Sequence, residues 1–476
     1  MTPNDSSKFY ECCIIGAGPA GLGAALELVR NGHTDIIIID KNDSVGGLSR
    51  THFFEGARFD IGPHRFFSKN KEVNEIWHSS LGADYRSVSR LTRIFYKNKY
   101  FYYPIKTFDI LTKLGFKESL KIILSSITSQ IKRTDKAITF ENWLIQKFGR
   151  RIYEVFFKTY TEKVWGIPCS QISAEWASKR IKGADAAGII RHALSLGKKR
   201  NIRTLAEKFN FPVLGAGQMY ESICDRVTSN GAGLMLNSRV GRFNIAKNKI
   251  NSIAVVDPAG KEIGISAKHF FSSIPLAHFF KMLSPSDSDE INRAADKLKY
   301  RDHVTVNLLV NKRDIFSDQW IYVHAPELKI ARVVNFNNFS EAMVENSNKT
   351  ALSAEFFLFK GAGLWNESDE ALAHLAIGDL DKMGILTEGD VEKTWVMRET
   401  EVYPVYYIGF QENYDLLKSR IDMISNLYSI GRGGMHKYNN MDHSLMSGIL
   451  AARNYLGIPD SPYVLWNIDT DSEYLE

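Results

Sequence analysis

Three glycines near the start of the chain have the spacing of a turn that binds phosphate. They lie in the string GAGPAG at residues 16–21. Gly16 permits a tight turn, Gly18 lets the backbone approach a pyrophosphate, and Gly21 lets a helix pack closely on a strand. Asp40 follows Gly21 by 19 residues, where a carboxylate can accept hydrogen bonds from ribose hydroxyls. The pattern predicts a dinucleotide-binding site.

Two further glycine-rich segments favour FAD over NAD as that dinucleotide. VGGLSR spans residues 45–50, just past the acid, and its glycines permit a close backbone approach to the adenosine half. Arg50, at the end of this string, can reach the flavin side. GRGG at residues 431–434 follows an apolar run, so its amides and the next helix suit the phosphates or the ribityl chain.

The elements needed to position these residues are a strand, a helix and a second strand. Residues 10–15 form a short apolar run that ends at a glycine, which indicates a buried strand. Residues 19–31 carry apolar side chains on one helical face, and Gly32 follows them. Residues 36–39 are a continuous isoleucine run of the kind that parallel sheets bury on both faces. We therefore expect a βαβ unit in the first 40 residues.

The rest of the chain changes character twice. Residues 107 to about 203 are rich in helical periodicity and poor in strand signals. Strands return from residue 211, and residues 307–359 are typical of a meander of antiparallel strands. The individual expectations are strands at residues 233–236, 250–257, 269–274, 304–310 and 427–430, and a helix at 444–456.

Composition excludes some classes of protein. The chain has 476 residues, 44% hydrophobic and 24% charged, which is the balance of a folded globular protein. No apolar run approaches the length of a membrane-spanning helix, and the polar first eight residues lack the apolar segment of a secretory signal. The four cysteines show no zinc-type spacing, so we expect no metal site. We expect a cytoplasmic protein, with the inner membrane surface as the alternative location.

Positive charge is concentrated in the middle of the chain. The net charge is +6, but residues 86–208 hold 26 Lys or Arg against 9 Asp or Glu. Such an excess indicates either an anionic partner or a solvated basic face. A nucleic acid is not expected, because no binding motif accompanies the charge.

The segment 106–136 contains much of this charge and also reads as an amphipathic helix. It could pack against its own domain, or it could contact a membrane surface or a lipid-linked phosphate substrate. Its apolar candidates are Ile110, Leu111, Leu114, Leu120, Ile122, Ile123 and Ile127.

Several longer strings resemble the UDP-galactopyranose mutases. They are DIGPHRF at residues 60–66, YTEKVWG at 160–166, SAEW at 173–176 and YNNMDHSLM at 438–446. The wider superfamily of these flavoproteins includes amine oxidases, protoporphyrinogen oxidases and carotenoid desaturases. The chain departs from the mutases at His436 and Lys437, where an aromatic residue and arginine are usual.

The resemblance implies an α/β fold: a Rossmann-like FAD/NAD(P)-binding domain with an inserted helical domain and an antiparallel β-sheet domain. The FAD-binding domain would comprise residues 1–106, 209–300 and 409–476. The helical, substrate-side domain would comprise residues 107–208. The sheet domain would comprise residues 301–408 and carry a mobile loop with Arg332.

The resemblance also implies an activity. Reduced FAD would act through N5 as a nucleophile and interconvert the pyranose and furanose forms of a nucleotide- or phosphate-linked sugar, with no net redox change. NAD(P)H would be the external reductant, and surface polysaccharide assembly the setting. Arg180, Arg332 and His64 would be the catalytic residues.

Further site residues follow from the resemblance. Substrate contacts would come from Tyr103, Phe156, Tyr160, Trp165, Trp320, Tyr322, Tyr403, Tyr438 and Asn440. Cofactor contacts would come from Gly16, Gly18, Gly21, Asp40, Gly47, Leu48, Ser49, Arg50, Gly62, His64, Gly431, Arg432, Met441 and Ser444.

Two other hypotheses stay open. An FAD-dependent oxidoreductase of the amine oxidase or protoporphyrinogen oxidase type would transfer hydride to the flavin. A flavin-binding protein without turnover would retain the cofactor alone. The sugar, its nucleotide or lipid carrier and the oligomeric state are not determined by these residues.

Overall fold

The glycine motif lies in the βαβ unit that the sequence indicates. In a computed structural model that describes residues 8–105, 107–131, 138–174, 208–459 and 466, this unit consists of β1 (Lys8–Ile15), α1 (Pro19–Arg30) and β2 (Ile36–Ile39). β1 and β2 pair in parallel, from Cys12 opposite Ile36 to Ile15 opposite Ile39. All four residues of β2 are buried, as expected for a strand covered on both faces.

The unit belongs to an eight-stranded sheet built from segments far apart in the chain. The strand order is β13-β10-β11-β12-β1-β2-β9, with β19 also paired to β12. β1 is parallel to β12, and β10, β11 and β12 form an antiparallel run. The added strands are β9 (Gly233–Met235), β10 (Arg239–Ala246), β11 (Lys249–Val256), β12 (Glu262–Ser272), β13 (Leu283–Ser284) and β19 (Leu427–Ser429).

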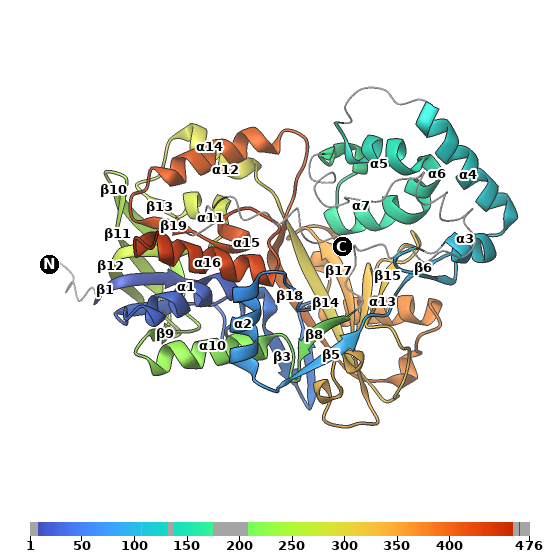
Figure 1. The fold of residues 1–476 in the computed structure, drawn as a ribbon, viewed down its shortest axis with the longest axis horizontal. Helices are drawn as coiled ribbons and strands as arrows, with labels where there is room; N and C mark the ends of the chain where they lie inside the picture. The colour runs from blue at the N-terminus through green and yellow to red at the C-terminus, as the bar shows by residue number, and fades with distance from the viewer. Residues whose placement is uncertain (1–7, 106, 132–137, 175–207, 460–465, 467–476) are drawn as a thin grey trace.

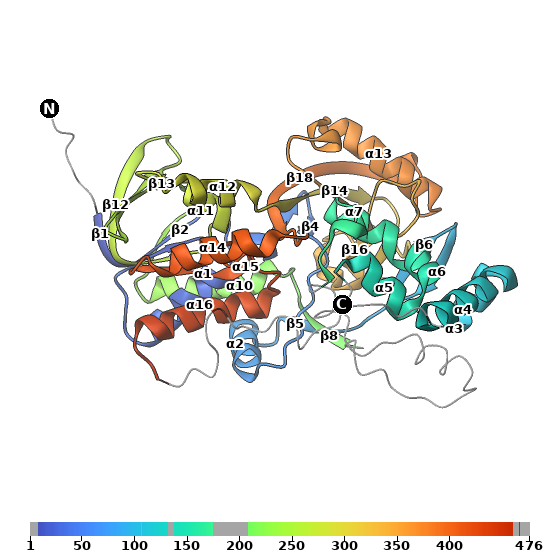
Figure 2. The ribbon, with the colours of Figure 1, turned by 90° about the horizontal axis from the view of Figure 1, so that it is seen from above.

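Helices from distant segments cover both faces of this sheet. On one face α1 lies beside α16 (Met441–Tyr455), as Figures 1 and 2 both show, with α2 (Lys71–Leu81) and α10 (Gly217–Ser229) nearby. The other face carries α11 (Leu276–Lys281), α12 (Asp289–Lys297) and α14 (Phe410–Asp422). Short elements complete this region: α15 (Gly431–Gly434) and the hairpin of β3 (Thr51–Phe54) and β4 (Ala57–Asp60).

A second sheet of seven strands forms the other half of the molecule. Its order is β18-β14-β17-β16-β15-β6-β7, and α13 (Asp369–Lys382) covers one face (Figure 2). The strands are β6 (Thr92–Tyr96), β7 (Lys99–Tyr102), β14 (Tyr300–Val310), β15 (Trp320–Val323), β16 (Arg332–Asn335), β17 (Thr350–Leu358) and β18 (Val391–Pro404). A further pair, β5 (Tyr85–Ser89) with β8 (Lys208–Pro212), runs between the two halves.

The expected meander over residues 307–359 is only partly correct. β15, β16 and β17 are sequential antiparallel neighbours, but β14 pairs with β17 and β18 and does not pair with β15. β15 instead pairs in parallel with β6, which comes from the first part of the chain. Alternation within each strand specifies which face is buried, but it does not specify the neighbouring strand.

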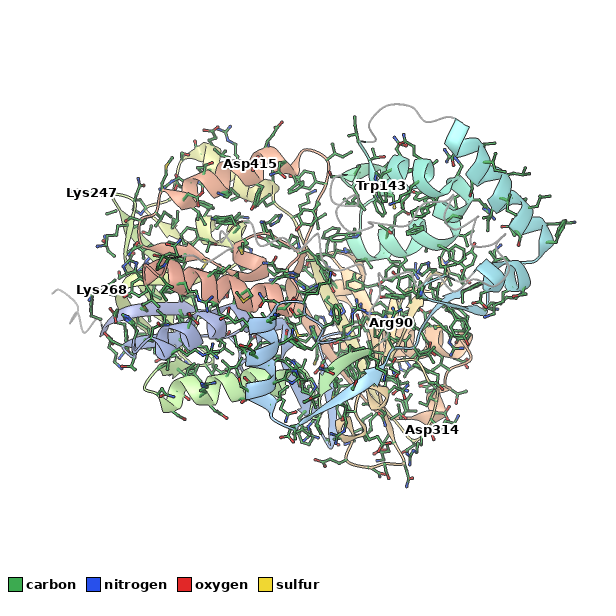
Figure 3. The ribbon with its side chains drawn as sticks, in the orientation of Figure 1. Arg90, Trp143, Lys247, Lys268, Asp314 and Asp415 are labelled. Atoms are coloured by element: carbon green, nitrogen blue, oxygen red, sulfur yellow. The ribbon has the colours of Figure 1, made fainter. Side chains whose placement is uncertain are left out.

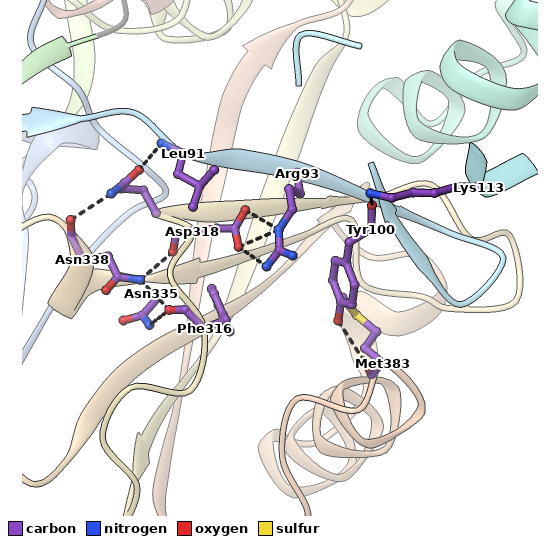
Figure 4. A network of polar contacts seen from close by, with 10 residues as sticks. Leu91, Arg93, Tyr100, Lys113, Phe316, Asp318, Asn335, Asn338 and Met383 are labelled. Atoms are coloured by element: carbon purple, nitrogen blue, oxygen red, sulfur yellow. Dashed lines mark hydrogen bonds and ion pairs between the residues drawn. The ribbon is translucent and has the colours of Figure 1, made fainter. Parts of the chain in front are cut away.

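A polar network joins β6 to β15 (Figure 4). The guanidinium of Arg93 donates from Nε to both oxygens of the buried Asp318, at 2.9 and 3.0 Å. Gln319 accepts a hydrogen bond from the Leu91 amide at 2.7 Å and donates to the Asn338 carbonyl at 3.1 Å. These contacts hold the strand that carries Trp320 and Tyr322.

The middle of the chain is helical in its described parts, as expected. It forms α3 (Thr107–Leu114), α4 (Phe116–Ile131), α5 (Phe140–Phe148), α6 (Arg150–Tyr153), a π-helical turn (Glu154–Lys158) and α7 (Thr159–Trp165). The single amphipathic helix expected here is interrupted at Gly115, which has a φ of +84° and separates α3 from α4. Within the described residues, every helix is too short or too polar to cross a membrane.

The fold class predicted from the sequence is confirmed: parallel and antiparallel sheets with a helical insertion make a mixed α/β fold. The domain boundaries stay a prediction. The predicted strands are present, with ends shifted by a few residues; β12, for example, begins at Glu262, seven residues before the expected start.

Gly448 tests how closely α1 and α16 must pack. A Cβ atom at Gly448 would lie 1.8 Å from the Ala20 carbonyl oxygen, whereas a Cβ at Gly378 in α13 would meet nothing within 4 Å. We expect Gly448→Ala to lower the free energy of unfolding by ~1–3 kcal/mol through overpacking. Gly378→Ala, the matched control, should raise it by ~0.5–1 kcal/mol. Urea unfolding measures both; equal effects of the two substitutions would contradict the close packing.

Candidate functional site

One cavity of about 1200 Å³ lies between the two halves of the molecule. It extends from the first glycine motif to the second sheet and the helical region. The site residues expected from the sequence line it, apart from two. Gly21 packs inside the βαβ unit, where a Cβ would lie 1.8 Å from the Gly16 carbonyl oxygen. Arg180 lies outside the described residues.

The first end of the cavity is made by two glycine loops in contact. A Cβ at Gly18 would lie 3.5 Å from the Cα of Gly47, which itself has a φ of +55°. No side chain caps the first turn of α1, so its backbone N–H groups remain available beside Gly18. An uncapped helix N-terminus in a bare backbone cradle binds a phosphate group well. These residues fit the pyrophosphate of a dinucleotide.

Asp40 ties this loop to the second strand. Its Oδ2 accepts a hydrogen bond from the Ala17 amide at 2.6 Å, and its Oδ1 accepts from the Asn42 amide and side chain at 2.8 and 2.9 Å. Carboxylate oxygens have further lone pairs, so Asp40 can still accept from a ribose. The residue therefore shapes the loop as well as facing the cavity.

Arg50 connects the loop to the other half of the molecule. Its Nη1 donates to the Gly47 carbonyl at 2.7 Å, and its Nη2 forms a short ion pair with Glu399 of β18. Both side chains line the cavity and are largely buried. Arg50 therefore joins the two walls of the cavity.

His64 lines the cavity from the segment that follows β4. Burial and the positive charges of Arg432 and Arg332 lower the pKa of His64 to about 3, so its imidazole is neutral near pH 7. Gly62, two residues earlier, has a φ of +87°, and a Cβ there would lie 3.0 Å from Nη2 of Arg332. Only glycine allows the segment to approach this guanidinium.

Arg332 forms a buried ion pair at the centre of the second sheet. Its Nε donates to the two carboxylate oxygens of Glu355 at 3.1 and 3.0 Å, and its Nη2 donates at 2.5 Å. His303 lies 2.9 Å from the same carboxylate. Arg332 is the first residue of β16, which pairs with β17, and is not a loop residue; the mobility expected of this segment stays a prediction.

Glu355 is fully buried, and its carboxylate is ionised. Burial alone would raise its pKa, but the charge of Arg332 and the hydrogen bond from His303 outweigh burial and lower the pKa to about 2. The sequence reasoning missed Glu355 and His303. A signal was present: Glu355 is the single charged residue in the apolar run of β17.

One aromatic group gathers around Arg432. The rings of Tyr403 and Tyr438 stack with centroids 4.9 Å apart, and the Arg432 guanidinium lies 5.2 and 4.9 Å from them. Trp165 approaches both rings at 6.3 and 6.0 Å. Arg432 is held by donating to the carbonyls of Asn439 and Val402. Tyrosine hydroxyls and a cation thus face the same part of the cavity.

A second aromatic group surrounds Tyr322 of β15. Its ring lies 5.1 Å from Tyr160, 5.3 Å from Tyr103 and 6.2 Å from Trp320. Tyr160 also stacks on His324 at 5.0 Å. Burial raises the pKa of Tyr160 well above its usual value, so its hydroxyl stays protonated. Together with Phe156, these rings form one wall of the cavity.

Two further arginines near this wall were not anticipated. Arg65 lies 5.9 Å from the ring of Trp320, and Arg90 lies 5.9 Å from the ring of Tyr103 and donates to its carbonyl at 3.4 Å. Nε and Nη1 of Arg90 are buried without a partner among the described residues, in the centre of Figure 3. Burial and the charge of Arg65 lower the pKa of Arg90. An isolated arginine in a sequence is usually interpreted as a surface residue, so the sequence does not indicate that Arg65 and Arg90 lie beside these rings.

Glu355 makes stability depend on acid pH. A carboxylate whose pKa falls from 4.5 to about 2 on folding contributes about 3 kcal/mol above pH 4.5, and this contribution is lost as the pH falls from 4.5 towards 2. We expect Glu355→Gln to unfold more easily at pH 7 and to lose less stability in this acid range than the parent. Glu392→Gln, at an exposed ion pair on β18, is the control. The melting temperature measured as a function of pH tests this prediction. If Glu355→Gln loses as much stability as the parent in the acid range, the depressed pKa assigned to Glu355 is contradicted.

A substitution at Gly18 should weaken cofactor binding without affecting the stability of the fold. A Cβ at Gly18 meets only ordinary contact distances, so we expect Gly18→Ala to change the unfolding free energy of the flavin-free protein by less than about 0.5 kcal/mol. The same methyl group would occupy the space beside the pyrophosphate, so flavin affinity should fall at least roughly tenfold, or about 1.4 kcal/mol. Titration with FAD, followed by flavin fluorescence, measures this. Full retention of affinity would show that this turn does not hold the dinucleotide.

Comparison with known proteins places the chain among flavoproteins. Residues 19–456 match the family of flavin containing amine oxidoreductases. The protein named "Probable UDP-galactopyranose mutase" of Klebsiella pneumoniae is 28% identical over 174 residues, which cover 34% of this chain and 42% of that protein. The chain thus matches less than half the length of this relative. A 4,4'-diapophytoene desaturase of Staphylococcus haemolyticus is 28% identical over 160 residues, which cover 33% of this chain and 28% of that protein.

Solved structures share the whole fold. A reduced UDP-galactopyranose mutase superposes with a TM-score of 0.83 over 98% of this chain and 100% of that one, at 22% identity. A putrescine oxidase bound to putrescine superposes with a TM-score of 0.62 over 95% of this chain and 100% of that one, at 15% identity. At these identities the similarity shows the fold, which agrees with the resemblance found in the sequence strings. The glycine cradle, the cavity and the family match over residues 19–456 together show that the chain belongs to the flavin containing amine oxidoreductase family.

Proposed function

We propose that the protein is a flavin-dependent mutase that interconverts the pyranose and furanose forms of a nucleotide-linked sugar. One observation carries the proposal: a fixed arginine, Arg332, lines the same cavity as the dinucleotide cradle and lies among aromatic side chains. An apolar or amine substrate needs no such cation, whereas a sugar diphosphate does. The fold shared with a reduced UDP-galactopyranose mutase supports the same reading.

The residues present fit FAD as the cofactor. Gly16, Gly18 and the first turn of α1 would hold its pyrophosphate, and Asp40 its adenosine ribose. Gly47 to Arg50, Gly62, His64, Gly431, Arg432, Met441 and Ser444 would surround the remainder. When bound and reduced, the flavin supplies a nucleophilic nitrogen for the anomeric carbon. NAD(P)H is the proposed source of the reducing electrons.

Arg332 is positioned to bind the departing diphosphate. Nε and Nη2 are occupied by Glu355, and Nη1 has no partner among the described residues, so it is free to donate to a phosphate oxygen. When the anomeric C–O bond breaks, its electron pair passes to the diphosphate, and a guanidinium stabilises this charge. The same bond re-forms on the isomerised sugar, so atoms and electrons balance without an oxidant. Arg180 is proposed to share this role.

The aromatic residues would bind and enclose the substrate. Tyr403, Tyr438 and Asn440 offer polar groups beside Arg432, where the diphosphate would lie. Tyr103, Phe156, Tyr160, Trp165, Trp320 and Tyr322 supply apolar surface for the nucleotide and keep water from the reacting carbon. His64, neutral near pH 7, can donate or accept a hydrogen bond next to the flavin. Surface polysaccharide assembly is the proposed setting.

The experiment incubates dithionite-reduced holoenzyme with UDP-galactopyranose and related nucleotide sugars. We expect the furanose isomer by chromatography, while the flavin spectrum stays that of the reduced form. Arg332→Lys keeps a charge but loses the forked contact, so kcat/KM should fall roughly 10–100-fold. Arg313→Lys, at an exposed position outside the cavity, is the matched control and should leave the rate unchanged.

The second candidate is an oxidoreductase of the amine oxidase or protoporphyrinogen oxidase type. It is favoured by the family match itself and by the fold shared with putrescine oxidase. It predicts that oxidised holoenzyme is bleached by an amine or by a protoporphyrinogen, with formation of a dehydrogenated product. Such bleaching, together with no isomer from the whole sugar panel, would replace the mutase proposal.

A further inference from the structure

The helix α4 presents its large apolar side chains to solvent. Phe116 is 82% exposed, Leu120 45%, Ile123 39%, Leu124 54% and Ile127 47%. The spacing of these five residues is i, i+4, i+7, i+8 and i+11, which places them on one face of the helix. We call this face the α4 stripe.

The protein-facing side of α4 carries two serines and one large apolar residue, Ile122, which packs in the core of the helical region. Ser119 and Ser126 are buried, and the Ser126 hydroxyl donates to the Phe148 carbonyl at 2.8 Å. A Cβ at Gly149 would lie 2.8 Å from the Ser126 backbone, so the helix packs very closely on the turn before α6. Two serines and Ile122 thus face the protein, whereas the five apolar residues of the α4 stripe face outward.

The α4 stripe lies at the end of the molecule. Both ribbon views place α4 at the far end of the long axis, on the outer side of the helical region and away from the first sheet (Figures 1 and 2). A surface that approaches this end would meet α4 first.

Positive charge borders the stripe. Lys117 and Lys121 are exposed and follow Phe116 and Leu120 by one residue, so they flank the stripe along one edge. The acids of α3 and α4 are already paired: Asp109 with Lys113 at 2.7 Å, and Glu118 with Arg151 and, at 3.2 Å, with Lys121. Over residues 106–136 the sequence holds seven Lys or Arg against three Asp or Glu.

We propose that α4 docks on an anionic lipid bilayer. The helix lies parallel to the membrane plane, with the α4 stripe among the upper acyl chains and Lys117 and Lys121 at the level of the lipid phosphates. Apolar insertion and lysine–phosphate attraction act together in helices of this kind.

The dimensions favour a bilayer over a second copy of the chain. The stripe covers three turns, about 17 Å by about 10 Å, whereas a stable protein interface takes about 800 Å² from each partner. A net positive edge also repels its own copy, whereas it attracts anionic headgroups.

The experiment is co-sedimentation of the FAD-loaded full chain with vesicles. We expect binding to vesicles of equal parts phosphatidylcholine and phosphatidylglycerol, weakening as salt rises, and much weaker binding to pure phosphatidylcholine. The triple variant Phe116→Ser, Leu120→Gln, Leu124→Gln should bind the anionic vesicles at least roughly tenfold more weakly. Lys117→Gln should weaken binding and flatten its salt dependence.

Controls distinguish the stripe from general apolar exposure. Phe9→Ser and Met423→Gln change residues that are 61% and 59% exposed on other elements, and both should bind as the parent does. Bound flavin and the melting temperature verify that each variant is folded. Equal binding of the parent and the triple variant would overturn the proposal. So would a parent dimer that the triple variant abolishes, without vesicle binding. The readout needs no turnover, so it is independent of the mutase proposal.

Discussion

The buried carboxylate of Glu355 organises the centre of the second sheet. It accepts hydrogen bonds from Arg332 on β16 and contacts His303 on β14, so three neighbouring strands share one charge cluster. A charge buried this deeply is tolerated only when its partners are in place, and loss of one partner leaves the other uncompensated. The strand ends, the segment at Gly62 and the wall of the cavity are therefore positioned together.

The other end of the cavity depends on glycines, which have no side chain to keep neighbouring backbones apart. Gly18 and Gly47 bring two loops into contact, and Gly448 lets α16 pack on the backbone of α1. The result is a bare backbone cradle at an uncapped helix N-terminus. Arg50, through its contacts with Gly47 and Glu399, then joins this cradle to β18. The glycine cradle at one end and Arg332 at the other are thus parts of one cavity with walls from both sheets.

The structure shows where part of the positive charge of residues 86–208 lies. Part of it is neutralised within the helical region, as in the pair of Arg151 with Glu118, and part lies beside the α4 stripe. If α4 rests on a membrane, the substrate-side helices stand next to the lipid surface.

The sequence by itself determined the local structure and the cofactor end of the site. GAGPAG at residues 16–21, an acid at residue 40 and an isoleucine strand at 36–39 define a βαβ unit, because turn chemistry and periodicity are local properties. Nearly all of the site residues named from the sequence also line the cavity. Only the tertiary structure decided which strands are neighbours, that Arg332 sits in a strand paired with Glu355, and that the apolar face of α4 points outward. These depend on contacts between residues distant in the chain, and hydrophobic periodicity specifies a face of an element without specifying what covers it.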